Sequence, residues 1–440
     1  MSLYGAMMTG VAGLSANSTA LSVASSNIAN VNTVGYKTAT SDFATLLAAA
    51  AGTSDPSSAG VVATAGQNVT QQGLLTTTSS STDMAISGNG LFIVSQTPST
   101  AGINEYTRAG SFTSDASGNL KNSSGLYLLG WKLDTSGKPP TNPNDLSLIN
   151  VNNLSGKAVA SGKIGLQANL QASATTVGTY NVATNNMASG AVTPDFQRTV
   201  SIDDSQGGTQ PLELSFVKTA ANTWAYEVSY RGAAGNITGS NPIGSGTMTF
   251  NSDGSLANVV PTGGSGTPAT GTISLTVPWS AASGLSSQAL SVNMGTVGAT
   301  DGFTQYDTAS TLTSANVDGA VYGSVSGISI SSDGTVSANF SNGLSQAVFK
   351  IPLATFANPD GLAEVSGNAY TTTPDSGTPI VNVASTGGAG TIQSKELEGS
   401  TVDLATEFTN LITTQRAYSA CSRIVTTASQ MLDELLQMSH

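Results

Sequence analysis

The amino-acid sequence predicts an α+β fold that is mainly β, with a helix at each end of the chain and antiparallel β-domains between the helices. Near both ends, apolar residues recur every seven positions, which is typical of helices that pack as an α-helical coiled coil. Between the ends, apolar and polar residues alternate, and Asn-Gly and Asp-Gly pairs interrupt the runs, which is typical of β-hairpins. Helices at opposite ends of one chain imply a discontinuous, nested architecture with two inserted β-domains.

The N-terminal helix is predicted from a heptad repeat that stops at the turn-forming residues 30–35. Its repeat positions are occupied by Met7, Val11, Leu14, Leu21 and Ile28. Residues 1–36 carry no charged side chain, although a helix that faces water normally has charges on its outer side. A coiled coil of the two ends of one chain would explain the repeat but would leave one side of each helix in water. The missing charges favour packing against other copies, and we expect this glycine-containing helix to fray in the monomer.

The C-terminal helix is predicted from a fuller repeat of the same length. The positions of its two interleaved seams are filled by Leu404, Phe408, Leu411, Gln415, Tyr418, Ser422, Val425, Ser429, Leu432 and Leu436. Ser400 and Asp403 form an S-x-x-D start signal, in which Ser400 would cap free amides of the first turn. The sequence thus predicts a helix over residues 401–438.

Composition excludes several classes of function. Of the 440 residues 9% are charged, and 26 acidic residues outweigh 14 basic ones, so no basic patch is available for nucleic acid. No apolar stretch predicts membrane insertion, and no basic segment before an apolar core predicts a cleaved signal peptide. A single cysteine, Cys421, and a single histidine, His440, leave no Cys/His metal cluster and no histidine placed to activate a nucleophile. We expect no cofactor, no metal and no enzymatic activity.

The order of these patterns predicts four parts of the chain. They are a helical core domain (1–36 and 400–440), an extended connecting region (37–80 and 365–399), an inner β-domain (81–171 and 295–364) and an outer inserted β-domain (172–294). The outer domain is set apart by a shift in composition, because it holds Trp224, Trp279 and long connections rich in Gly, Ser and Thr.

Three segments resemble the signatures of the flagellar rod and hook axial protein family. The first is Asn27–Lys37, the second is Tyr106–Phe112 with the TRAG sequence inside it, and the third is Leu397–Tyr418. The motif residues that they carry are Asn30, Asn32, Thr33, Gly35, Tyr36, Thr107, Arg108, Gly110, Glu398, Asp403, Gln415 and Arg416. Thr401 departs from the Asn that is usual in the family, which hardly disturbs a helix start. The matches cover the outer parts of the chain and leave the insert unmatched.

The resemblance implies a structural subunit of the bacterial flagellum. Hook members of the family self-assemble into a curved, flexible tube that transmits torque from rod to filament, with the terminal helices forming the inner tube and the β-domains outside. The resemblance also implies export by the flagellar type III apparatus to the extracellular hook, and contacts with the distal rod protein, the hook–filament junction protein and the hook cap. Length favours a hook subunit over a distal rod or other axial protein, because rod subunits are shorter. A secreted β-rich adhesin or surface-layer protein is the alternative outside the family.

Overall fold

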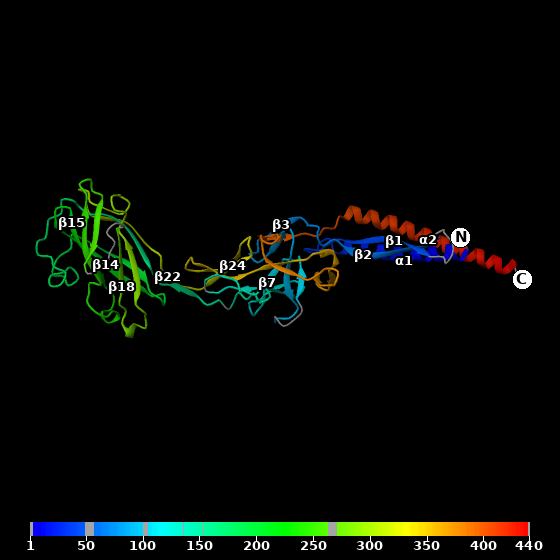
Figure 1. Cartoon of the computed structure of the whole chain (residues 1–440), viewed down its shortest axis with the longest axis horizontal. Helices are drawn as coiled ribbons and strands as arrows, with labels where there is room; N and C mark the ends of the chain where they lie inside the picture. Colours follow the sequence, from blue (N-terminus) through cyan, green and yellow to red (C-terminus); the bar gives the residue numbers. More distant parts are fainter. Residues whose placement is uncertain are drawn as a thin grey trace. The chain divides into compact units, whose positions relative to one another are not determined.

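The computed structural model describes residues 3–48, 57–99, 104–134, 136–152, 154–262 and 271–438. Within these ranges, strands far outnumber the two α-helices, which belong to the two ends of the chain (Figure 1), so the expected mainly β fold is confirmed. The chain divides into two compact units, both of which are discontinuous in the sequence. The first unit comprises Met1–Leu154, Gly327–Asn339 and Ser345–His440, and the second comprises Ser155–Ser326 and Phe340–Leu344.

The N-terminal helix α1 spans Leu3–Ala29 and ends at the turn-forming segment, as the sequence predicts. The amide of Asn30 still donates to the carbonyl of Ser26 at 3.1 Å, but the amide of Thr33 donates to the carbonyl of Asn30 at 3.0 Å in a tight turn. The hydroxyl of Thr33 also donates to the side-chain oxygen of Asn30 at 3.1 Å. These bonds turn the chain away from the helix axis.

The C-terminal helix α2 spans Leu404–Met438, so it begins later than the predicted start at Thr401. Asp403, not Ser400, is the cap, because its Oδ1 accepts from two amides of the first turn at 2.8 and 3.2 Å. The predicted start is wrong because Thr401 is held elsewhere. Its amide donates to the carbonyl of Tyr36 at 3.1 Å, which keeps this residue against the segment that follows α1.

A β-hairpin lies on α1 (Figure 1). Its strands β1 (Ala39–Ala48) and β2 (Ser57–Gln67) pair antiparallel. Gly60 permits the close approach, because a Cβ there would lie 2.8 Å from the Cβ of Ala12 in α1. The sequence predicts only an extended connection here. It does not reveal the pairing, because the stretch between the strands contains no Asn-Gly or Asp-Gly signal.

The rest of the first unit is built around one large sheet. Among the described residues its thirteen strands are β5 (Leu91–Ser95), β6 (Glu105–Thr107), β7 (Phe112–Ser114), β8 (Leu120–Asn122), β9 (Tyr127–Lys132), β10 (Ser147–Leu148), β23 (Val325–Ile330), β24 (Thr335–Phe340), β25 (Ser345–Lys350), β26 (Pro352–Thr355), β27 (Ala363–Val365), β28 (Ala369–Thr371) and β29 (Ile380–Val383). A 3₁₀ turn, Pro359–Gly361, follows β26. The core of this sheet is apolar. Phe92 and Phe112 are fully buried in it and pack edge to face, with 5.9 Å between their ring centroids.

Two short strand pairs tie the two halves of the first unit together. β3 (Leu75–Thr77) pairs with β31 (Glu396–Glu398), and β4 (Met84–Ser87) pairs with β30 (Thr391–Ser394). The segment that follows the β1–β2 hairpin is thereby bonded to the segment that precedes α2. This pairing sets the position of the site described below.

The second unit consists mainly of two five-stranded sheets over one core. One sheet has the order β13 (Phe196–Asp203), β14 (Thr209–Ala220), β15 (Thr223–Tyr230), β16 (Gly244–Phe250), β17 (Leu256–Pro261). The other contains β18 (Thr272–Val277), β19 (Gln288–Asn293), β12 (Lys163–Asn169), β20 (Phe303–Thr304) and β21 (Thr311–Val317). A further pair is formed by β11 (Lys157–Val159) and β22 (Ala320–Gly323), and two 3₁₀ turns span Ala234–Asn236 and Ala281–Ser283. Trp224, Tyr226 and Phe216 are almost fully buried in the core.

The inserted unit is larger than the outer domain that the sequence predicts at 172–294. Strand β12 pairs with β19 in parallel and with β21 antiparallel, so residues on both sides of the predicted boundaries belong to one sheet. The boundaries predicted from composition are too narrow because β12 and β21 have the same alternating pattern as the strands of the first unit. Composition alone therefore does not assign these two strands to the inserted unit.

Candidate functional site

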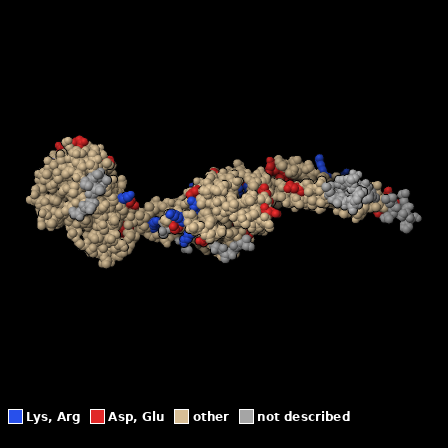
Figure 2. All heavy atoms as spheres, in the orientation of Figure 1, with Lys and Arg blue, Asp and Glu red and all other residues tan. Residues whose placement is uncertain are grey.

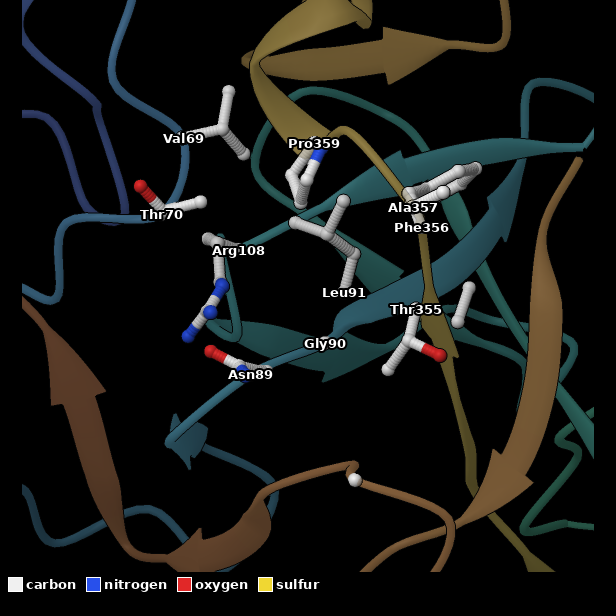
Figure 3. A pocket seen from close by; sticks show the side chains of 12 residues that line it. Val69, Thr70, Asn89, Gly90, Leu91, Arg108, Thr355, Phe356, Ala357 and Pro359 are labelled. Atoms are coloured by element: carbon white, nitrogen blue, oxygen red, sulfur yellow. The ribbon is translucent and has the colours of Figure 1, made fainter. Parts of the chain in front are cut away.

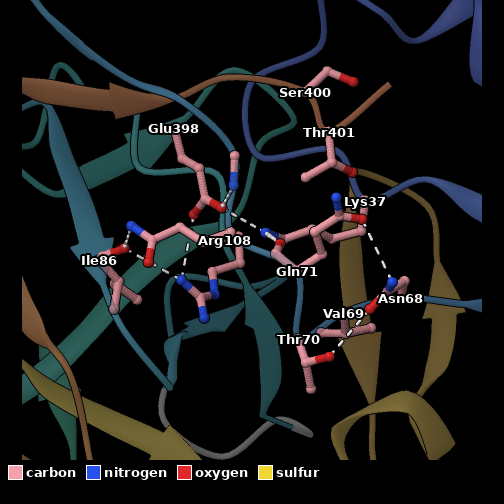
Figure 4. Close-up of polar contacts among 12 residues, drawn as sticks. Lys37, Asn68, Val69, Thr70, Gln71, Ile86, Arg108, Glu398, Ser400 and Thr401 are labelled. Carbon is pink, nitrogen blue, oxygen red and sulfur yellow. Dashed lines mark hydrogen bonds and ion pairs between the residues drawn. The ribbon is translucent and has the colours of Figure 1, made fainter. Parts of the chain in front are cut away.

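The three motif segments, which are far apart in the sequence, meet in the first unit. Lys37 Nζ lies 2.5 Å from Glu398 Oε1, and Arg108 Nη1 lies 3.3 Å from Glu398 Oε2 (Figure 4). The side chains of Lys37 and Glu398 have no exposed surface, and that of Arg108 is 3% exposed. We call these three residues the motif junction. Each of them comes from a different one of the three segments.

The segment after α1 is shaped to bring Lys37 into the motif junction. Gly35 has a φ of +69°, and a Cβ there would lie 2.7 Å from the amide nitrogen of Ala109, so glycine is required both for the turn and for the contact. Its amide donates to the carbonyl of Glu398 at 2.7 Å. Lys37 Nζ also donates to the carbonyl of Gln71.

Asn27, in the last turn of α1, fixes the direction in which the chain leaves the helix. Its Oδ1 accepts from the hydroxyl of Tyr36 at 3.1 Å and from the amide of Ala39 at 3.0 Å. Its Nδ2 donates to the carbonyl of Ala39 at 2.8 Å. Asn27 and Tyr36 are both buried, so the end of α1, the turn and the start of β1 form one bonded unit.

The second segment forms a tight turn that points Arg108 inward. The hydroxyl of Thr107 donates to the carbonyl of Asn368 at 2.7 Å and accepts from the amide of Ala109 at 3.0 Å. Arg108 donates from Nη2 to the carbonyl of Gly88 at 2.8 Å and from Nη1 to that of Ile86 at 3.3 Å. The guanidinium therefore also ties together strand β4 and the turn that follows it.

Burial and charge act in opposite directions on the motif junction. Desolvation lowers the pKa of Lys37 and the pKa of Arg108, and the carboxylate of Glu398 raises both. Glu398 also accepts from the amide of Gly73 at 2.8 Å. Two cations share one carboxylate, so the junction carries one uncompensated positive charge. Such a cluster is stable only when the remaining donors are bonded, and most of them bond backbone carbonyls here.

The remaining motif residues lie outside the motif junction. Asn30 and Thr33 bond each other, Gly110 lies against the backbone of Met84, and Asp403 caps α2. Asn32, Gln415 and Arg416 are exposed. Sequence reasoning did not single out Lys37, Asn27 or Gln71 as site residues. One signal was available, since Lys37 is the first charged residue of the chain and follows an uncharged helix.

On α1, the side that faces the rest of the monomer is made of small residues. Its buried positions are Gly10, Gly13, Ala16, Ala20, Ala24 and Asn27. A Cβ on Gly13 would lie 2.8 Å from Sγ of Cys421, and one on Gly10 would lie 2.9 Å from a methyl carbon of Val425, so α2 packs directly on these glycines. Of the seam residues predicted on α1, four are half-buried, namely Met7, Leu14, Leu21 and Ile28. The fifth, Val11, is 47% exposed.

The predicted seam residues of α2 differ in exposure along the helix. Leu411, Val425 and Leu432 are half-buried, whereas Leu404, Tyr418 and Phe408 are exposed, Phe408 by 51%. The side chain of Leu436 lies outside the described part, as does His440. Ile412, Ile424 and Met431 are also exposed, although they were not assigned to the seam. In one copy, the paired helices thus leave a large part of their apolar surface uncovered.

The charge distribution agrees with the low content of ionisable residues. On the face shown in Figure 2, charged side chains are sparse. In the described ranges, no helix is apolar and long enough to cross a membrane, and no group of three or more His, Cys, Asp or Glu residues is placed to hold a metal ion.

Comparisons with known proteins match the whole chain to flagellar axial proteins. The matching family models are "Flagella basal body rod protein" (7–37), "Flagellar hook protein FlgE/F/G D1 domain" (85–177), "Flagellar basal body protein FlaE D2 domain" (169–320) and "Flagellar basal body rod FlgEFG protein C-terminal" (393–438). The flagellar hook protein FlgE of Rhizobium meliloti is 36% identical, and that of Caulobacter vibrioides 33% identical, over 100% of both chains. The chain belongs to the flagellar hook protein family.

The hook protein FlgE of Escherichia coli is 31% identical over 97% of this chain and 98% of its own. A crystal structure of a Helicobacter pylori flagellar hook protein, FlgE2, matches 73% of this chain and 100% of its own with a TM-score of 0.47 at 17% identity. The hook family is one of structural flagellar proteins. Three of its models cover the three motif segments, and the fourth covers the insert that those segments leave unmatched.

Proposed function

We propose that this hook-family chain is a structural subunit whose copies polymerise through α1, α2 and the β1–β2 hairpin into the curved tube of the flagellar hook. The observation that carries the proposal is the exposure of large apolar side chains on these elements. They are Tyr4, Met8 and Val11 on α1, Phe43, Leu46 and Val62 on the hairpin, and Leu404, Phe408, Ile412, Tyr418, Ile424 and Met431 on α2. Apolar surface on this scale marks an interaction site.

Burial of these side chains supplies the driving force for assembly. Each large apolar side chain stabilises a complex by about 1.5–3 kcal/mol when it passes from full exposure to full burial. The absence of charge from residues 1–36 means that no ion has to be desolvated on α1 as helices of neighbouring copies approach. Small residues such as Ser15, Ser18 and Ser22 on its outer side allow a close interhelical distance.

In the tube that we propose, the helices of many copies form a nested coiled-coil core and the β-units lie outside it. The apolar helical contacts hold while the outer contacts change as the curved tube rotates and transmits torque. Support for this division comes from composition. The β-units are rich in Ser, Thr, Asn and Gly, whose hydrogen bonds exchange with water or neighbours for about 0.5–1.5 kcal/mol each.

The proposal includes a location and partners. The subunit is exported by the flagellar type III apparatus and functions outside the cell, in the hook of the basal body. It contacts other copies of itself, the distal rod protein below, the junction protein above and the hook cap during growth. The full-length similarity to proteins named flagellar hook protein supports these assignments over a distal rod subunit or an adhesin.

The test is a charge placed on the exposed apolar side of α2. Phe408→Asp should abolish polymer formation in vitro and motility in a strain that lacks its own hook subunit, because a carboxylate cannot be buried unpaired between helices. Thr409→Asp is the matched control, since Thr409 is exposed next to it and outside the apolar surface. Leu411→Asp, at a half-buried position, should also prevent assembly while leaving the β-units folded by circular dichroism.

Electron micrographs of the wild-type polymer complete the test. Curved tubes are expected from a hook subunit, and straight tubes would identify a rod subunit instead. If Phe408→Asp assembles as well as Thr409→Asp, the proposed role of α2 is wrong. If the wild-type chain forms no tubes under any condition that polymerises hook subunits, the proposed function itself fails.

A further inference from the structure

Two Asn-Gly pairs occur in the chain, and their surroundings in the structure are opposite in kind. Asn89-Gly90 lies in the turn before β5, and Asn342-Gly343 lies in the turn between β24 and β25. In such a pair the backbone nitrogen of the glycine can react with the side-chain amide of the asparagine, because glycine has no Cβ to hinder the approach. The contacts around each pair therefore decide whether it reacts.

The side chain of Asn89 is free to react. It is exposed at a pocket of about 380 Å³ in the first unit, which Gly90 and Arg108 also line (Figure 3). Within the described part of the chain, the side-chain amide of Asn89 has no hydrogen-bond partner. No hydrogen bond of this side chain has to break before its Cγ is attacked, and water reaches it from the solvent.

The backbone of the same pair is activated. The carbonyl oxygen of Asn89 accepts from the amide of Gly390 at 2.7 Å. This oxygen and the nitrogen of Gly90 belong to one peptide group, so negative charge that forms when the nitrogen loses its proton is shared with the oxygen. A donor on the oxygen stabilises this charge and makes the nitrogen easier to deprotonate.

Asn342 is held by three hydrogen bonds of its side chain. Its Nδ2 donates to the carbonyls of Val321 at 2.7 Å and Lys157 at 3.0 Å. Its Oδ1 accepts from the amide of Leu344 at 3.1 Å. The amide of the glycine that follows, which would be the nucleophile, donates to the carbonyl of Phe340 at 3.0 Å. Both reacting groups of this pair are thus engaged elsewhere.

We propose that Asn89 is a site of spontaneous deamidation in the folded protein and that Asn342 is protected from it. The nitrogen of Gly90 attacks Cγ of Asn89, and a new C–N bond forms as the bond from Cγ to Nδ2 breaks. The proton of the Gly90 amide leaves with the side-chain nitrogen as ammonia, which gives a cyclic succinimide. Water then opens the ring at one of its two carbonyls and gives aspartate or isoaspartate. In sum, one amide and one water become one carboxylate and one ammonium ion.

The isoaspartyl product loosens the turn before β5. In this isomer the chain runs through the former side chain of residue 89, so the backbone gains one methylene group. The carbonyl that accepts from Gly390 becomes a free carboxylate and is no longer part of the backbone. All five residues of β5 are buried, so the strand cannot shift to absorb the added length without disturbing its packing.

Peptide mapping by mass spectrometry tests the proposal on the full-length subunit. After long incubation at mildly alkaline pH, the peptide that contains Asn89 should show conversion of the amide to aspartate and isoaspartate. Asn342 should convert more slowly by about tenfold or more, because three hydrogen bonds must break first. The same chain in concentrated urea is the matched control, since neither pair is held there and both should convert at similar rates.

A variant and a stability measurement complete the test. Asn89→Gln should release less ammonia than the wild type and leave its peptide unconverted, because glutamine would have to close a larger ring. Asn89 is exposed, so this variant should fold as before. The isoaspartyl form, separated by ion-exchange chromatography, should unfold at a lower urea concentration than the untreated subunit.

The proposal is overturned if Asn89 persists in the folded protein while it converts in urea, or if Asn342 converts as fast as Asn89 in the folded protein. Formation of aspartate without isoaspartate would exclude the succinimide, and equal unfolding midpoints would exclude the effect on the turn before β5. None of these outcomes depends on polymerisation, so failure of the proposed function would leave them unchanged.

Discussion

Lys37 and Glu398, which are 361 positions apart in the sequence, form a fully buried ion pair with an N–O distance of 2.5 Å. The pair joins the segment that leaves α1 to the strand that leads into α2. Arg108 bonds the other carboxylate oxygen, so a third segment is tied to the same group. The two helices are therefore positioned by one carboxylate as well as by their own contacts.

Removal of that carboxylate should be strongly destabilising. We expect Glu398→Gln to lower the stability of the first unit by about 3–5 kcal/mol, because two buried cations would lose their counter-ion. Hydrogen exchange resolved by segment should show faster opening in the first unit and no change in the second. Glu213→Gln is the control, since the pair of Glu213 with Arg231 is partly exposed and should contribute at most about 1 kcal/mol. Equal losses in the two variants would contradict the assigned role of Glu398.

The contact between α1 and α2 can be tested with a disulfide. A Cβ on Gly13 would lie 3.8 Å from the Cβ of Cys421, which is close to the mean separation in disulfides. Gly13→Cys should therefore oxidise to an intramolecular disulfide with Cys421, detected as a loss of both free thiols and faster migration without reductant. Ser18→Cys, on an exposed position of α1, should keep its thiol. Two free thiols in oxidised Gly13→Cys would show that the helices do not pair in this register.

Much of the fold follows from the spacing of large apolar residues, but the contact between the helices does not. Heptad positions predict both helices and their approximate ends. They mark Leu14 and Leu21 as the packing surface, whereas the structure packs Gly13 and Cys421 together. A hydrophobic repeat weights large side chains, and small residues that permit close approach of two helices contribute nothing to it.

The motif junction could be predicted only in part. The resemblance to a family singled out Arg108 and Glu398, but the spacing of residues gives no sign that they bond each other and Lys37. A pairing across hundreds of residues depends on the strand pairs that bring β31 and β3 together, and strand pairing has no local signature. A pocket beside the junction, lined by Arg108 and by residues of β5 and β26, was not predicted for the same reason.

Gly110 should tolerate no side chain, because a Cβ there would lie 1.6 Å from the carbonyl oxygen of Met84. The clash is with backbone, which cannot rotate away as a side chain does. We expect Gly110→Ala to destabilise the first unit by about 1–3 kcal/mol or more, measured by urea unfolding. In Gly327→Ala, a Cβ would meet no described atom within 4 Å, so this control in the same unit should be neutral or slightly stabilising. Equal midpoints for the two variants would contradict the packing at Gly110.

Buried tyrosines should make the second unit sensitive to alkali. Tyr226 is 1% exposed, its hydroxyl has no partner in the described part of the chain, and burial raises its pKa well above 10. Above pH 10 the unfolded chain loses this proton while the folded chain keeps it. The protonated phenol of Tyr226 therefore makes its full contribution to the free energy of unfolding below pH 10. This contribution is lost as the pH rises towards the pKa of Tyr226 in the folded protein.

Tyr226→Phe isolates this contribution, because it removes the ionisable group and costs no hydrogen bond: the hydroxyl has no partner in the described part of the chain. We expect the stability of the wild-type second unit to fall with pH above about 10, and the slope for Tyr226→Phe to be shallower by up to about 1.4 kcal/mol per pH unit. Lys37 does not interfere with this measurement. Its pKa is lowered on folding, so its effect on stability increases with pH instead of decreasing, and it belongs to the first unit. Urea unfolding followed by segment-resolved hydrogen exchange between about pH 9 and pH 11 measures both slopes. Identical slopes would mean that the phenol of Tyr226 ionises in the folded protein as readily as in water, and would contradict its assigned burial in the core.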